Sequence, residues 1–188
     1  MRKIKVIFFA VIFLSFNTNA ANSEVIIKKN EDSSREFNIK FTFESSNSVK
    51  KNFRLLSNFK KIDRFNPSLV EVTIISKDIN GVVLKTLFRD CVLFFCRDML
   101  MYESILSYCI DDYHCVINAE VIPNVKSPIK SGQTSWTIKP SKNIDSSQID
   151  YHSSFSANIS LPPFFGESIF KKTINRNLMF LKDTIGKY

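Results

Sequence analysis

Hydrophobic and polar residues alternate most regularly between positions 36 and 44. Every second residue there is apolar, and the apolar set is Phe37, Ile39, Phe41 and Phe43. Successive side chains of a β-strand point to opposite faces, so a period of two predicts a strand with one face in the core. The inward face carries large side chains, which is typical of a core strand.

The period then changes from two to about 3.6. Apolar residues recur at intervals of three or four over residues 48–59, with charged residues between them, which predicts an amphipathic helix. A second short helix is expected over 60–65. It should end there because Pro67 pushes Asn66 out of the helical region of backbone space.

Short alternating segments dominate the chain from about residue 69 onward. Strands are expected on both sides of residues 79–81, because Asn80 and Gly81 form a dipeptide that two-residue hairpin turns prefer. Further strands are predicted over about 99–110, 115–122, 132–139 and 149–159.

A long helical pattern closes the chain, predicted over about 165–186 after Pro162 and Pro163 stop the last strand. One stripe of this helix is apolar and consists of Ile169, Ile174, Leu178, Leu181 and Ile185. The stripe should face the strands, so the sequence predicts an α+β protein with one sheet and one long C-terminal helix.

The first 20 residues have the order of an export signal. Basic residues precede an apolar run at 6–14, which is shorter than the about 20 residues of a membrane span. The small residues Thr18 and Ala20 predict cleavage after Ala20, with Ala21 as the second choice and an uncleaved anchor as the alternative. The Phe-, Ile-, Asn- and Lys-rich composition is typical of an AT-rich bacterial genome, so we expect a location in the periplasm of a Gram-negative bacterium.

The remaining length fits one domain. We therefore expect a signal peptide at 1–20, a disordered or extended segment at 21–34 and a single domain at 35–188. The net charge of +8 is scattered along the chain, which indicates solvated faces; the alternative is weak association with an anionic membrane surface. An exported protein is not expected to bind nucleic acid, and we expect a monomer.

Four cysteines, Cys91, Cys96, Cys109 and Cys115, form an even set in a compartment that permits disulfides. Local pairing would join Cys91 to Cys96 and Cys109 to Cys115. A link between neighbouring strands, Cys96 to Cys109, is the alternative that the sequence leaves open. No histidine cluster accompanies the cysteines, so neither a metal site nor a cofactor is expected.

The order of elements and several local motifs resemble the START-like, or SRPBCC, superfamily. The motifs are the segment 89–97 (RDCVLFFCR), Gly132 followed by Trp136, and the segment 161–166 (LPPFFG). The resemblance is to the polyketide cyclase/dehydrase and lipid-transport branch and to coenzyme-Q-binding members, and it covers residues 36–187.

The resemblance implies a helix-grip fold: a curved antiparallel sheet wrapped around the C-terminal helix, with two short helices after the first strand. It also implies a cavity between sheet and helix for a lipid, a quinone or a similar hydrophobic ligand. Candidate lining residues are Phe41, Phe43, Arg89, Tyr102, Trp136, Tyr151, Phe155, Phe165 and Leu178.

Catalytic motifs are missing from the sequence. It has no nucleophile elbow, no phosphate-binding glycine loop and no metal set, and the carboxylates Glu103, Glu120 and Asp150 are expected on solvent-facing positions. The leading hypothesis is a non-enzymatic periplasmic protein that binds or carries a hydrophobic ligand. The alternatives are an envelope or host-interaction protein, virulence-associated, that acts through its surface, and a cyclase or hydrolase, which would need a buried titratable pair in the cavity.

Overall fold

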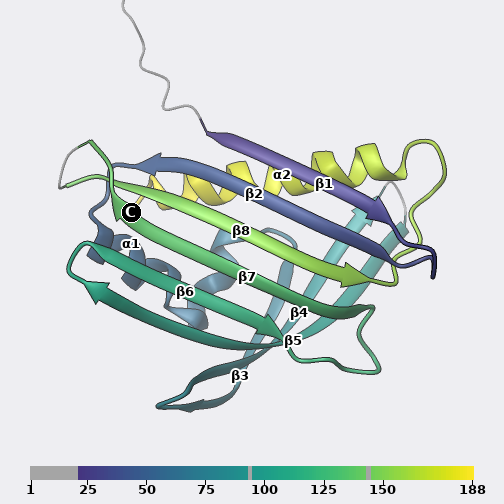
Figure 1. Ribbon diagram of the computed structural model, residues 1–188, viewed down its shortest axis with the longest axis horizontal. Helices are drawn as coiled ribbons and strands as arrows, with labels where there is room; N and C mark the ends of the chain where they lie inside the picture. The colour runs from purple at the N-terminus through teal and green to yellow at the C-terminus, as the bar shows by residue number, and fades with distance from the viewer. Residues whose placement is uncertain (1–20, 93–94, 143–144) are drawn as a thin grey trace, which may run out of the picture.

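The computed structural model of the 188-residue chain describes residues 21–92, 95–142 and 145–188, without the side chains of residues 90–97. In these ranges eight antiparallel strands form one sheet in the order β1-β2-β8-β7-β6-β5-β4-β3 (Figure 1). The strands and helices are β1 (Asn22–Lys29), β2 (Arg35–Ser45), α1 (Val49–Leu56), η1 (Phe59–Phe65), β3 (Leu69–Asp78), β4 (Gly81–Val92), β5 (Phe95–Asp111), β6 (His114–Val121), β7 (Ile129–Pro140), β8 (Ser147–Ala157) and α2 (Gly166–Ile185).

The sheet curves around α2, which lies across its inner face (Figure 1). Helix α2 contacts β1 and β2 near one edge of the sheet and η1, which packs on β3, near the other edge. Its residues Leu178, Leu181 and Ile185 are buried in the main core, as the apolar stripe predicted. The predicted α+β helix-grip fold is therefore confirmed.

Strand β2 supplies the centre of the core. Its four alternating residues, Phe37, Ile39, Phe41 and Phe43, are at most 3% exposed. They face the sheet interior beside β8, where Phe37 pairs with Phe155 and Phe43 with Ile149. Phe37 and Phe155 stack with their ring centroids 4.6 Å apart. The period-two pattern thus identified both the strand and its buried face.

Strand β1 occupies most of the segment expected to be disordered or extended. It pairs with β2 from Asn22 opposite Thr42 to Lys29 opposite Arg35. Most of its side chains are exposed, and only Val25 and Ile27 are partly buried. The sequence gives little hydrophobic signal for such an edge strand, because its pairing depends on backbone hydrogen bonds.

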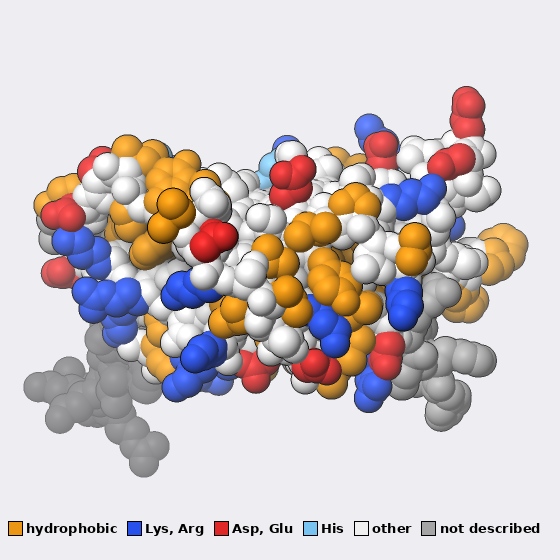
Figure 2. Space-filling model, turned by 90° about the horizontal axis from the view of Figure 1, so that it is seen from below, with side chains coloured by type: hydrophobic (Ala, Val, Ile, Leu, Met, Phe, Trp, Pro, Cys, Tyr) orange, Lys and Arg blue, Asp and Glu red, His pale blue; other side chains and the backbone are white. Residues whose placement is uncertain are grey.

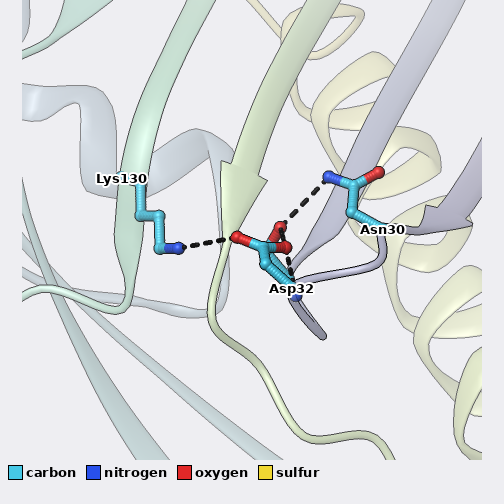
Figure 3. Close-up of polar contacts among 4 residues, drawn as sticks. Asn30, Asp32 and Lys130 are labelled. Atoms are coloured by element: carbon cyan, nitrogen blue, oxygen red, sulfur yellow. Dashed lines mark hydrogen bonds and ion pairs between the residues drawn. The ribbon is translucent and has the colours of Figure 1, made fainter.

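A polar cluster fixes the turn between β1 and β2 (Figure 3). The Asn30 Nδ2 donates to Ser34 Oγ at 3.1 Å, and the Ser34 backbone N donates to Asp32 Oδ1 at 3.0 Å. Lys130 Nζ, at the start of β7, lies 3.3 Å from Asp32 Oδ2. The hydrogen bonds from Ser34, assisted by Lys130, lower the pKa of Asp32 to about 2. The turn is thereby tied to β7, which lies two places beyond β2 in the sheet.

The β3–β4 hairpin turn is shifted by one residue from the predicted position. Asp78 pairs with Gly81, so the two turn residues are Ile79 and Asn80 rather than Asn80 and Gly81. Gly81 begins β4 with φ +132°, and a Cβ there would lie 2.4 Å from the Ile105 carbonyl oxygen. The glycine is needed for its backbone conformation and for the close approach of β5.

Cys109 and Cys115 form a disulfide across the β5–β6 hairpin. This bond excludes the alternative link between Cys96 and Cys109. Cys91 and Cys96 occupy opposite positions in the β4–β5 register, but their side chains lie outside the described residues.

Candidate ligand-binding site

A cavity lies between the inner face of the sheet and the helices α2 and η1. It has two adjoining lobes of about 170 and 240 Å³. Both lobes share a wall made by Asn66, Phe88, Glu103, Thr134, Trp136, Tyr151 and Asn177. Sites for small molecules are commonly apolar cavities of about 300–1,000 Å³, and the joint volume of the two lobes falls within that range.

Strand alternation determines which side chains form the cavity wall. On β5 the residues Met99, Met101, Glu103 and Ile105 face inward, and they lie beside inward residues of β4 and β6. Helix α2 covers the opposite side with Ile174, Leu178 and Leu181, and η1 adds Phe59, Ile62 and Phe65.

Trp136 and Tyr151 form the centre of the wall on neighbouring strands. They are paired across β7 and β8, and their ring centroids are 4.5 Å apart. The Tyr151 hydroxyl is hydrogen-bonded with Ser153 and Thr134, whose own hydroxyl oxygens are 2.9 Å apart. Burial raises the pKa of Tyr151, and the nearby Glu103 charge raises it further. Tyr151 is therefore a neutral, anchored phenol.

Glu103 is the residue that the sequence placed wrongly. We expected it on a solvent face, but it lies opposite Leu84 of β4 and points into both lobes of the cavity. Residues 99–106 of β5 carry apolar side chains on both faces, so the period of two did not reveal which face is buried. The buried face of β5 is determined by its registers with β4 and β6. No local sequence pattern reveals these registers.

The half-buried Glu103 carboxyl lies in the cavity wall without a compensating charge. It makes no hydrogen bond or ion pair with any other residue that the structure describes. Burial raises the pKa of Glu103 to about 7, because removal from water disfavours the carboxylate. The group is therefore poised between its neutral and ionised forms near neutral pH.

A second polar group enters the cavity from α2. Asn177 donates through Nδ2 to Ser68 Oγ at 2.9 Å. Its Oδ1 is buried and has no hydrogen-bond partner among the described residues. Glu103 and Asn177 thus present unpartnered oxygen atoms to the same cavity from opposite layers of the fold.

Four of the nine candidate lining residues line the cavity: Trp136, Tyr151, Phe155 and Leu178. The structure places the other five elsewhere. Phe41 and Phe43 are 1% exposed and fill the packed core, with their rings 5.1 Å apart. Burial of an aromatic side chain does not distinguish core packing from a cavity wall, which is why the sequence could not separate the two groups.

The remaining three candidates lie outside the cavity lining. Arg89 pairs with Asp98 through two contacts of 2.6 and 2.7 Å on the exposed side of β4 and β5. Tyr102 takes the outward position between Met101 and Glu103 on β5, and Phe165 is 51% exposed at the start of α2. The presence of a polar group on a strand side chain therefore correctly predicted Trp136 and Tyr151 as lining residues. It failed for Arg89 and Tyr102.

The other two carboxylates expected on solvent faces are on the outer face of the sheet. Glu120 is exposed. Asp150 accepts a hydrogen bond from Thr42 at 2.9 Å and lies 2.9 Å from Lys139 Nζ. The described residues contain no group of three or more His, Cys, Asp or Glu side chains that could hold a metal ion.

Within the described ranges, no helix combines the length and the hydrophobicity that crossing a membrane requires.

Solved structures with the same fold extend over most of this chain. Human STARD10 is 15% identical, with a TM-score of 0.61 over 87% of this chain and 74% of its own. The aromatase/cyclase ZhuI from a Streptomyces species is 12% identical, with a TM-score of 0.60 over 81% and 93%. A STAR-related lipid transfer protein from Xanthomonas axonopodis is also 12% identical, with a TM-score of 0.57 over 86% and 98%.

A search of curated proteins finds no match. The family profile described as polyketide cyclase / dehydrase and lipid transport matches residues 46–182, which include α1, every strand from β3 to β8 and most of α2. The chain therefore belongs to the polyketide cyclase/dehydrase and lipid-transport family and has the START-like fold.

Proposed function

We propose that this protein binds and carries a small hydrophobic molecule in the cavity between the sheet and α2, without chemically changing it. The cavity itself is the observation that carries this proposal: its walls are mostly aliphatic and aromatic, and a few polar groups converge in it. Such a lining favours an apolar ligand, and each ligand methylene group buried in it contributes about 0.8 kcal/mol.

The proposed place of action is the periplasm. Support comes from the basic and apolar order of the first 20 residues and from the Cys109–Cys115 disulfide, which persists in oxidising compartments. Fractionation of the producing cells checks this proposal. A cytoplasmic protein at full precursor mass would contradict export.

Native mass spectrometry of the protein purified from its own cells tests the carrier proposal directly. We expect a defined adduct that organic extraction removes and incubation with an envelope lipid extract restores. An apo mass before and after that incubation would overturn the proposal and favour a protein that acts through its surface.

A matched pair of variants shows whether the cavity is the binding site. Ala119 lines the smaller lobe from β6, and its neighbour Asn118 is exposed on the outer face. Ala119→Phe should weaken binding of the extracted ligand by about tenfold or more because the new ring occupies the space of the ligand. Asn118→Phe adds the same ring outside and should bind as the wild type does.

One observation favours a second candidate function, acid–base catalysis on the bound molecule. Glu103 and Tyr151 are two half-buried titratable groups in one cavity, and the pKa of Glu103 is raised to about 7, where a general acid or base is efficient. Incubating the extracted ligand with wild-type protein and with Glu103→Gln distinguishes the candidates. A change in ligand mass that only the wild type produces would establish an enzyme, whereas an unchanged ligand supports a carrier.

A further inference from the structure

The lining of the cavity contains an acidic side chain but no basic one. Among the described residues of both lobes, Glu103 and Tyr151 are the only titratable side chains, and no Lys, Arg or His is present. A ligand carboxylate or phosphate that entered this space would lose its hydration without an ion pair to a basic side chain. The Glu103 carboxylate would also repel it.

Two of the polar groups that enter the cavity, Glu103 and Asn177, offer acceptor atoms without a partner. The Glu103 carboxyl has no partner among the described residues, and the buried Asn177 Oδ1 has none either. The Tyr151 hydroxyl already has hydrogen-bond partners in Thr134 and Ser153, so it is satisfied without a ligand. A buried acceptor without a donor is costly, and a ligand that brings a donor removes that cost.

We infer that the ligand is an amphiphile whose polar end is a hydrogen-bond donor, a hydroxyl or a protonated amine, which Glu103 holds with Asn177 as the second acceptor. This inference rests on the proposed carrier function and narrows it to a ligand class. The apolar part of the molecule lies along the shared wall at Trp136 and Phe88, where both lobes offer hydrophobic surface.

A headgroup series tests the inference with one chain length throughout. The probes are tetradecanol, tetradecylamine and tetradecanoic acid, titrated against the purified full chain at pH 8. Trp136 is the only tryptophan and forms the cavity wall, so its fluorescence reports occupancy. We expect the alcohol or the amine to bind about tenfold or more tightly than the acid, because only their heads can donate to a carboxylate.

Two matched variants separate the role of Glu103 from that of overall charge. Glu103→Gln removes the carboxylate from the cavity, and Glu120→Gln makes the same change on the exposed outer face. Glu103→Gln should weaken binding of the preferred donor probe by about tenfold and narrow the gap to the acid, while Glu120→Gln should change neither.

The pH dependence distinguishes the two donor heads. Binding of the amine should strengthen from pH 6 to pH 8 as Glu103 ionises, since Tyr151, the other titratable lining group, stays neutral over that range. Binding of the alcohol should change less.

The outcomes also separate this inference from the proposed function. Equal binding of all three probes, unchanged in Glu103→Gln, would overturn the donor-head inference and leave the carrier proposal intact. Preferred binding of the acid would overturn it as well. If no probe and no envelope lipid changed the Trp136 signal or the native mass, the carrier function itself would fail.

Discussion

The partial burial of Glu103 in the cavity wall has a consequence for stability that does not depend on any ligand. An ordinary Glu titrates at 4.5, whereas burial raises the pKa of Glu103 in the folded protein to about 7. Between these pH values the folded protein holds a proton that the unfolded chain has lost. Folding stability must therefore fall as the pH rises from about 4.5 to about 7, and this loss is complete above pH 7.

Glu103→Gln should abolish this loss of folding stability at neutral and alkaline pH. Glutamine resembles the neutral carboxylic acid and does not ionise, so the variant should match the wild type at pH 4 and exceed its free energy of unfolding by about 1–3 kcal/mol at pH 8. Urea denaturation at both pH values measures the difference. Glu120→Gln is the control, and equal effects of the two substitutions at pH 8 would show that Glu103 is not buried as described.

The sequence predicts the direction of a side chain only where polar and apolar residues alternate cleanly. The alternation 37–43 correctly identified buried residues because polar residues separate the apolar ones, leaving one choice of inward face. Around Glu103 both faces of β5 carry apolar residues, so the pattern assigns an acidic residue there to the outer face. The two acceptors of the candidate site, Glu103 and Asn177, became recognisable only from the strand register and the packing of α2.

A buried polar network joins three elements at one end of the sheet. Asn52 of α1 is 0% exposed, and its Nδ2 donates to Ser147 Oγ of β8 at 2.7 Å. Asn47, just before α1, donates through Nδ2 to the Ile185 carbonyl at the end of α2 at 3.1 Å and to Asn52 Oδ1 at 3.3 Å. The network therefore fixes α1 and the C-terminal end of α2 to the same strand.

Asn52→Ala should cost about 2–3 kcal/mol of unfolding free energy. The substitution removes one member of a buried network and leaves the polar groups of Asn47 and Ser147 with fewer partners. Chemical denaturation measures the loss. Asn58→Ala removes an exposed asparagine that makes no side-chain cap bond and should change stability little. Similar losses in both variants would show that the network does not hold these elements together.

The Cys109–Cys115 disulfide links the two strands of the β5–β6 hairpin. Cys115 is 0% exposed in the core, whereas Cys109 is exposed, so Cys109→Ala breaks the bond and leaves the core side chain in place. We expect a loss of about 2 kcal/mol from the released short loop. Comparing urea unfolding of the variant with that of the oxidised wild type measures it, and unchanged stability would mean that the strand pairing alone fixes the hairpin.

Elements were predictable where a hydrophobic period ran through them. The stripe from Ile174 to Ile185 predicted α2 at 165–186, and the structure has it at Gly166–Ile185. Strand β1 has no such stripe, because it lies at the sheet edge and mostly exposes its side chains, so the sequence could not predict its pairing with β2. The β3–β4 turn was predicted to within a residue, since Gly81 identifies the turn but its exact place depends on contact with Ile105.

At the scale of the whole molecule, the positive charge is dispersed. Figure 2 shows Lys and Arg side chains in separate places on one face, with Asp and Glu among them. The net charge of +8 therefore supports only weak attraction to anionic lipid headgroups. We predict measurable sedimentation with anionic vesicles at low salt that is lost near physiological ionic strength, where exposed charges are screened. Binding that persists at high salt would indicate an inserted apolar surface instead.

The cavity also links the stability of the whole fold to its ligand. An empty space between the sheet and α2 deprives both layers of packing contacts, and a bound molecule restores them. A ligand present at about 100 times its Kd should add about 2.7 kcal/mol to the unfolding free energy, which raises the Tm by about 5–10 °C in a domain of this size.

Thermal unfolding of delipidated protein with and without the extracted ligand measures this shift. Ala119→Phe should show a smaller shift at the same ligand concentration because the ring fills part of the cavity, and Asn118→Phe should show the full shift. A full shift in Ala119→Phe would place the stabilising ligand elsewhere on the molecule. A shift lost only in Ala119→Phe would show that the ligand completes the packing of α2 against the sheet, so that loading and unfolding are coupled through one cavity.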